Sequence, residues 1–190
     1  MARVRIGLAQ LRQATQGAAN WPAALQAAVE VLTAIAAEAD FKEAHGELAA
    51  MLSAIAEGLA ADARKKTAPA LVDQTRQALA MTEKYVPKSL RPASKLADVE
   101  ASLALTVREI ARGNELDKAT AAMLEMAKHA KTQEAYELCN ALLRRYPESA
   151  DDAKLQEALL AVSREQKALV KIVEERKPAE TSERPTAVLS

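Results

Sequence analysis

The chain has 190 residues, of which 49% are hydrophobic and only 3% aromatic, and its 26 basic side chains balance 26 acidic ones. This length suffices for one large core or for several stacked helical units. Zero net charge argues against a global attraction to nucleic acid or to anionic membranes, and a single cysteine excludes an internal disulfide.

The abundant residue types are those that lose least on entering a helix, namely Ala and Leu together with Glu, Lys, Arg and Gln. Glycine occurs only five times, so the composition predicts an all-α protein. The most apolar stretch, Ala23 to Ala37, contains Glu30 and is too short to span a bilayer. We expect a soluble, cytoplasmic protein, or a periplasmic one if the chain is excised from a longer precursor.

The first half of the chain predicts four helices, because apolar residues recur there every three or four positions. A short helix near Val4 to Leu11 belongs to an N-terminal segment, residues 1–19, which we set apart from the main helical region. The three following helices begin at residues whose side chains can cap a helix, which are Asn20, Asp40 and Thr67.

The second half predicts a proline-broken connection, YVPKSLRPAS, followed by four more helices. The first of them starts at Ser94 and ends at a turn, RGNELD, in which Gly113 serves as the C-cap residue. The next runs from Leu116, and the last two are capped by Thr132 and Ser149.

Two boundaries follow from this pattern. Residues 20–176 form one helical domain of about seven helices joined by short connections, so that successive helices run antiparallel. Residues 177–190 contain prolines, polar residues and little to bury, which is typical of a disordered linker or tail. The tail also indicates that the chain is a region of a larger protein.

The segment EAYELCNALLRRYPESADDAKLQEAL resembles the second helix and exit of a tetratricopeptide repeat. Ala135 matches the small residue that lets paired helices approach, Cys139 occupies the large-residue position four residues later, and Pro147 matches the closing proline. RRYPES is similar to the ending common in bacterial members. The preceding helix departs from the pattern, with Met123 where the family has a small residue and Met126 in the aromatic position.

The resemblance covers residues 115–160, whereas residues 20–112 contain helix pairs without the signature. It implies antiparallel helix hairpins stacked as an α-solenoid, and an irregular helical bundle is the alternative. The family's usual role implies protein–protein binding, but its groove residues do not map onto an intact motif in this sequence.

Few residues suggest catalysis or metal binding. Cys139 lies on an apolar stripe, which favours a buried small hydrophobe over a reactive thiol. His45 and His129 are the only histidines, and no Glu-x-x-His pair accompanies them. The sequence has neither a Gly-x-Ser-x-Gly motif nor a phosphate-binding glycine loop. We therefore expect no catalytic residue, metal or cofactor.

Charge is unevenly distributed along the chain. Residues 21–63 carry seven acids and one lysine, whereas residues 64–95 carry eight basic residues and two acids. Four of the basic side chains cluster around the proline-broken connection and form a candidate partner-binding patch, which consists of Lys84, Lys88, Arg91 and Lys95. The alternative interpretation is a solvated rim that complements the neighbouring acidic block.

The pattern as a whole favours a non-enzymatic scaffold that binds another protein or a peptide segment, not nucleic acid. One alternative is a purely structural helical spacer in a larger, envelope-associated protein. Another is a helical enzyme or metal-binding protein that uses carboxylates.

Overall fold

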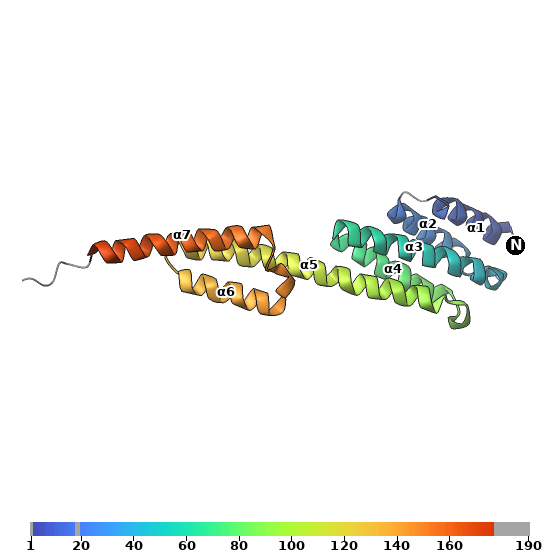
Figure 1. Cartoon of the computed structure of the whole chain (residues 1–190). Helices are drawn as coiled ribbons and strands as arrows, with labels where there is room; N and C mark the ends of the chain where they lie inside the picture. Colours follow the sequence, from blue (N-terminus) through green and yellow to red (C-terminus); the bar gives the residue numbers. More distant parts are fainter. Residues whose placement is uncertain (1, 18–19, 177–190) are drawn as a thin grey trace, which may run out of the picture. The chain divides into compact units, whose positions relative to one another are not determined.

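The structure, a computed structural model, describes residues 2–17 and 20–176. These ranges contain seven α-helices, three 3-10 helices and no strand, which confirms the all-α prediction. The α-helices are α1 (Ala2–Thr15), α2 (Trp21–Ile35), α3 (His45–Lys66), α4 (Pro69–Tyr85), α5 (Ala93–Lys128), α6 (Thr132–Arg145) and α7 (Ala153–Arg176) (Figure 1). The 3-10 helices are η1 (Phe41–Ala44), η2 (Lys88–Leu90) and η3 (Pro147–Ser149). The expected tail, 177–190, lies outside the described residues.

The helices fall into two compact units, unit 1 (Met1–Ala111) and unit 2 (Arg112–Ser190). This division differs from the sequence-based one, which set residues 1–19 apart and treated residues 20–176 as one domain. The N-terminal helix α1 packs against α2 and α3 because its apolar stripe of Val4, Leu8 and Leu11 is buried. It therefore belongs to the core of unit 1.

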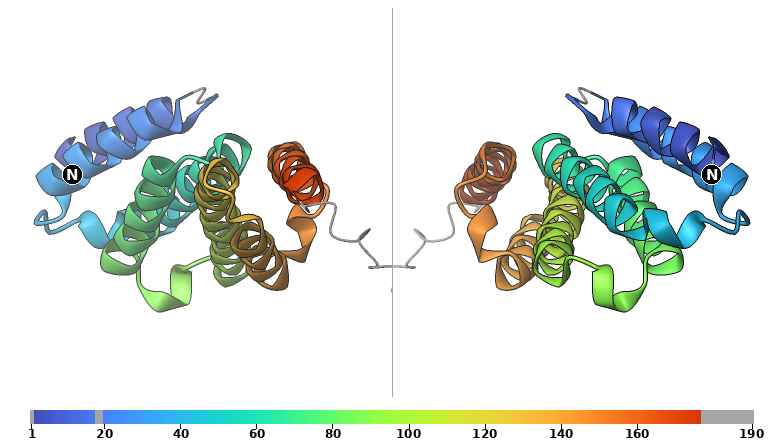
Figure 2. Two further views of the ribbon diagram at one scale, coloured as in Figure 1. Left: turned by 90° about the vertical axis from the view of Figure 1, so that its left-hand side faces the viewer. Right: turned by 90° about the vertical axis from the view of Figure 1, so that its right-hand side faces the viewer.

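Unit 1 is built from helix pairs, with α1 packed against α2 and α3 packed most extensively against α4 (Figure 2). Alanines allow the close approach, since Ala56, Ala60 and Ala63 of α3 and Ala78 of α4 are all buried. Larger side chains from α3 fill the centre of this core, which is formed around Leu48, Leu52, Ile55 and Leu59. Burying each such side chain contributes about 1.5–3 kcal/mol.

Unit 2 consists of the second part of α5 with α6 and α7. Its smaller core is centred on Met123 of α5, Cys139 of α6 and Val162 of α7. Ala135 is fully buried, so a small side chain stands where α6 meets its neighbours. The described part of unit 2 thus consists of three helices around one small core.

The largest difference from the predicted elements concerns α5, which runs without a break from Ala93 to Lys128. The prediction of a turn at RGNELD with Gly113 as its C-cap residue is wrong, because the helix continues through both. Gly113 is helical, and a Cβ added to it would meet no atom within 4 Å. Glycine weakens a helix without ending it, and the flanking apolar residues preserve the helical period.

Among the predicted N-cap residues, Asn20 is confirmed by a side-chain hydrogen bond. The Asn20 side chain accepts a hydrogen bond from the Ala23 amide (3.2 Å) at the start of α2. Thr67 instead ends α3 in a left-handed conformation (φ 46°). The cap of α7 is Asp152, whose carboxylate accepts from the Lys154 amide (3.0 Å), whereas Ser149 is buried in η3.

Candidate functional site

The four residues of the predicted basic patch lie in unit 1, at the end of α4, in η2 and at the start of α5. Arg91 is held by the backbone. Its Nε donates to the Val86 carbonyl (2.9 Å) and its Nη2 donates to the Glu83 carbonyl (2.6 Å). These carbonyls belong to the C-terminal end of α4, which has no intrahelical donors for them. Arg91 therefore caps the C-terminal end of α4 with its side chain.

The three lysines of the patch differ in their surroundings. Lys95 Nζ lies 3.3 Å from Glu57 Oε1, so it joins the basic block to the acidic block. Lys84 Nζ lies 4.9 Å above the ring of Tyr85, a cation–π contact. Lys88 is exposed in η2. With Arg91 and Lys95 engaged by neighbouring groups, the arrangement favours the interpretation as a charged rim over that of a docking patch.

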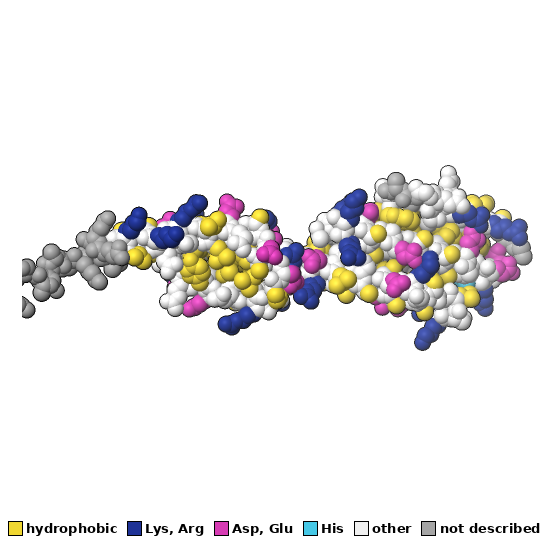
Figure 3. All heavy atoms as spheres, in the orientation of Figure 1, with side chains coloured by type: hydrophobic (Ala, Val, Ile, Leu, Met, Phe, Trp, Pro, Cys, Tyr) yellow, Lys and Arg dark blue, Asp and Glu magenta, His cyan; other side chains and the backbone are white. Residues whose placement is uncertain are grey.

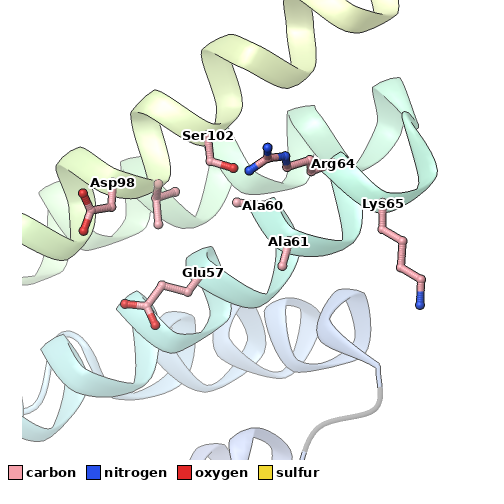
Figure 4. Close-up of a pocket in the computed structure, with 8 residues that line it drawn as sticks. Glu57, Ala60, Ala61, Arg64, Lys65, Asp98 and Ser102 are labelled. Carbon is pink, nitrogen blue, oxygen red and sulfur yellow. The ribbon is translucent and has the colours of Figure 1, made fainter.

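A shallow pocket of about 420 Å³ lies between α3 and α5 in unit 1 (Figure 4). Alanine side chains and Val99 form its apolar part, and charged side chains stand around it. In Figure 4 the guanidinium of Arg64 points toward Ser102, whereas the carboxyl groups of Glu57 on α3 and Asp98 on α5 stand apart from each other on the other side of the pocket. The lining residues are Glu57, Ala60, Ala61, Arg64, Lys65, Asp98, Val99 and Ser102.

Ser102 is the only hydroxyl-bearing residue among those that line this pocket. No histidine lines it, so Ser102 has no neighbouring imidazole to accept its proton. His45 packs edge-on against Phe41, with ring centroids 5.2 Å apart, and His129 is exposed at the far end of α5. Across residues 2–17 and 20–176 no three His, Cys, Asp or Glu side chains gather as a metal site would require.

Cys139 lies in the core of unit 2 with 3% of its surface exposed. Burial raises the pKa of its thiol, because an apolar surrounding disfavours the thiolate. The reactive form is therefore scarce in the folded protein.

We predict that Cys139 reacts with a thiol reagent at least about a hundredfold more slowly in the native protein than in denaturant, because reaction requires opening of unit 2. The rate is measured by absorbance at neutral pH. Met123→Ala, which loosens the same core, is expected to accelerate the native reaction. Equal rates in the native and denatured states would contradict the buried placement.

A more apolar groove, of about 480 Å³, lies between α5 and α7 in unit 2. We call it the α5–α7 groove. Alanines and the half-exposed Leu124 supply its apolar surface, and four charged side chains edge it. Its lining residues are Ala121, Leu124, Glu125, Ala127, Lys128, Ala161, Arg164 and Glu165.

Two ion pairs lie at or near this groove. Asp117 Oδ1 lies 2.5 Å from Lys154 Nζ and joins α5 to α7 beyond one end of the groove. This contact raises the pKa of Lys154. Along the α5 edge, the Lys128 ammonium donates to Glu125 (2.6 Å) and lowers the pKa of that carboxyl. The α5 edge of the groove is therefore polar, whereas its floor is apolar.

Sequence reasoning missed this groove. Leu124, which lines the groove, remains 38% exposed. Apolar side chains are exposed elsewhere in unit 2 as well, and Figure 3 shows them gathered over α6 and α7 on one face. Alanines form most of the groove floor. Because alanine is common throughout this sequence, nothing in the sequence distinguishes the alanines of the groove from the others.

Searches against protein-family models, curated proteins and solved structures find no match to this chain. None of the helices in the described ranges combines the length and the apolar character needed to cross a membrane. A functional interpretation therefore depends on the residues and contacts of the chain itself.

Proposed function

We propose that the chain is a non-enzymatic protein–protein interaction scaffold that binds a segment of a protein in the α5–α7 groove. The observation that carries this proposal is the combination of small floor residues, Ala121, Ala127 and Ala161, with the exposed apolar side chain of Leu124. Such a floor leaves room for larger apolar side chains of a bound segment, spaced as on one face of a helix.

Charged residues at the groove edges support the same function. Glu125 and Lys128 stand on α5, and Arg164 and Glu165 on α7, so each edge offers both signs of charge. An apolar centre within a polar rim is the usual composition of a protein-binding surface. The tetratricopeptide resemblance of residues 115–160 adds support, and we extend the proposal to a stacked arrangement of helix hairpins.

A second candidate function, a structural spacer in a larger protein, is favoured by α5. This single helix contributes Val99 and Leu103 to the core of unit 1 and Leu116 and Met123 to the core of unit 2. A spacer would need no groove occupant, so the two candidates differ in whether Leu124 contacts a protein.

We predict that a photo-cross-linking amino acid at position 124 of the full chain, expressed in its native cells, yields one defined adduct with a protein. With that partner purified, Leu124→Glu is expected to raise the dissociation constant at least about tenfold, because a carboxylate would be buried against apolar groups. Calorimetry or fluorescence anisotropy measures the affinity.

Val107→Glu is the matched control, since Val107 is also on α5 and also 38% exposed but lies in unit 1. It should bind as the unmodified chain does. If position 124 gives no adduct, or if both glutamate variants bind equally well, the groove is not the binding surface and the spacer function is favoured.

A further inference from the structure

The middle of α5 carries no buried side chain. Thr106 is the last buried residue of α5 in unit 1, and Leu116 is the first in unit 2. Between them, the side chains of residues 107–115 are exposed or half-buried, although Figure 1 shows the helix running on through this stretch. Ile110 is partly buried against the core of unit 1. We call residues 107–115 the α5 joint.

The long helix α3 of unit 1 has no comparable gap. Each of its turns from Leu48 to Ala63 contributes a buried side chain to the core. In proteins, most of the stability of a helix comes from packing of this kind, and an isolated short helix is marginal in water. The α5 joint is therefore the least supported stretch of α5 that has a core on both sides of it.

The two cores pack on different faces of α5. Unit 1 buries Leu103 and Thr106, whereas unit 2 buries Leu116 and Met123. Successive residues of a helix are turned by about 100°, so Leu116, which follows Thr106 by ten residues, lies about 80° away from it around the helix. The line of buried side chains does not continue through the joint, and the packing of one unit therefore does not hold the helix in the other.

The composition of the joint lowers the cost of opening it. Gly113 and Asn114 are adjacent weak helix formers. If the helix opens between them, glycine is the residue that best follows a helix end, with the positive charge of Arg112 favourable beside it. Asn114 is a good N-cap residue for the helix that follows, and Glu115 then lies at its positive end. Both ends formed by opening would thus be stabilised by residues already in place.

We infer that α5 is a two-state element, in which the helix opens and re-forms within the joint while the cores of both units stay folded. Opening breaks the hydrogen bonds from the amides of residues 113–115 to the carbonyls four residues earlier. It also releases surface contacts, such as that from Arg112 Nη1 to Ser149 Oγ (3.5 Å). No buried side chain is exposed, so the joint opens more readily than either unit unfolds.

This conformational device goes beyond both candidate functions and does not depend on what binds the α5–α7 groove. While α5 is closed, one continuous helix contributes to both cores. When the joint is open, the two cores are connected by a few unpaired residues instead of by a rigid helix.

Amide hydrogen exchange of the full chain, followed residue by residue by NMR, tests this inference. The amides of residues 113–115 are expected to be at least about tenfold less protected than those of Thr120 and Met123, which are buried in unit 2. Gly113→Ala combined with Asn114→Ala should raise protection of the joint about tenfold, because alanine favours the helix at both positions. A Cβ at position 113 meets no atom within 4 Å, so no clash offsets this gain.

Gly46→Ala combined with Asn140→Ala is the matched control, because it makes the same two changes at exposed positions of α3 and α6. It should leave protection of the joint within about twofold, since helix propensity acts on the helix that contains the residue. Met123→Ala separates opening of the joint from unfolding of unit 2. It is expected to reduce protection of the Thr120 amide strongly, and that of the joint by less than about twofold.

The inference fails if the amides of residues 113–115 are as well protected as those of Thr120 and Met123, because the joint would then open only when unit 2 unfolds. It fails equally if Met123→Ala reduces protection by the same factor at both places. A joint whose protection does not change when both of its weak helix formers are replaced by alanine would show that Gly113 and Asn114 do not control the opening, and would also overturn the inference.

Discussion

Replacing Met123 with alanine is expected to destabilise unit 2 by about 2–5 kcal/mol, the usual cost of removing a large buried side chain. Met123 is fully buried and lies between α5 and the two helices packed on it, with Cys139 and Val162 in the same core. Because this core is small, neighbouring side chains can close the resulting cavity only in part. The cost is a large share of the stability of a domain of this size.

The measurement separates the two units. Trp21 is the only tryptophan and lies in unit 1, so its fluorescence follows unfolding of that unit, whereas far-ultraviolet circular dichroism follows all helices. In urea, Met123→Ala should shift the dichroism transition strongly and the fluorescence transition much less. Leu124→Ala is the matched control and should cost less than about 1 kcal/mol, since Leu124 is 38% exposed. If both variants lost the same free energy of unfolding, Met123 would not lie on the buried face of α5 with Leu124 on its exposed face, as the structure has them.

The existence of the helices could be predicted from the sequence because apolar residues repeat at the helical period wherever a helix packs on a core. In α6 the stripe of Ala135, Cys139 and Leu142 is buried as the spacing predicts. The start of α2 was also predictable, since Asn20 and Pro22 both favour a helix start.

The length of α5 was not predictable in this way. Gly113 and Asn114 suggest a turn, but each weakens a helix by only about 1 kcal/mol or less. Burial of Leu103 on one side and Leu116 on the other outweighs that cost, and it depends on tertiary packing that the sequence does not display. The same reason explains why the division into two units, which falls within this helix, could not be predicted.

The candidate site was less predictable than the fold. The basic patch was chosen from sequence proximity, yet the Arg91 side chain folds back onto the carbonyls that end α4. The α5–α7 groove joins two helices that are separated along the chain by α6, so no local pattern marks it. Its alanines can be identified as a groove floor only when the two helices are known to lie side by side.

Replacing Gly58 with alanine is expected to destabilise unit 1 by about 1–3 kcal/mol, the cost of overpacking a core. Helix propensity alone predicts the opposite sign, because alanine in the middle of a helix is about 1 kcal/mol better than glycine. At this position the packing against Trp21 outweighs the helix propensity of alanine. Gly58 lies in the middle of α3 beneath the indole of Trp21, and an added Cβ would overlap the ring atoms Cε2 and Cδ2.

A double-mutant cycle isolates this clash, because Trp21→Ala removes the ring that the new methyl group would meet. In that background Gly58→Ala should become stabilising, by up to about 1 kcal/mol, as propensity predicts. Gly113→Ala is the matched control, since a Cβ there meets nothing, and it should be stabilising in both backgrounds. All variants are compared by urea unfolding followed by circular dichroism. If Gly58→Ala stabilises the chain that retains Trp21, the close packing of the Trp21 ring of α2 on Gly58 of α3 is wrong, because an added Cβ would overlap that ring.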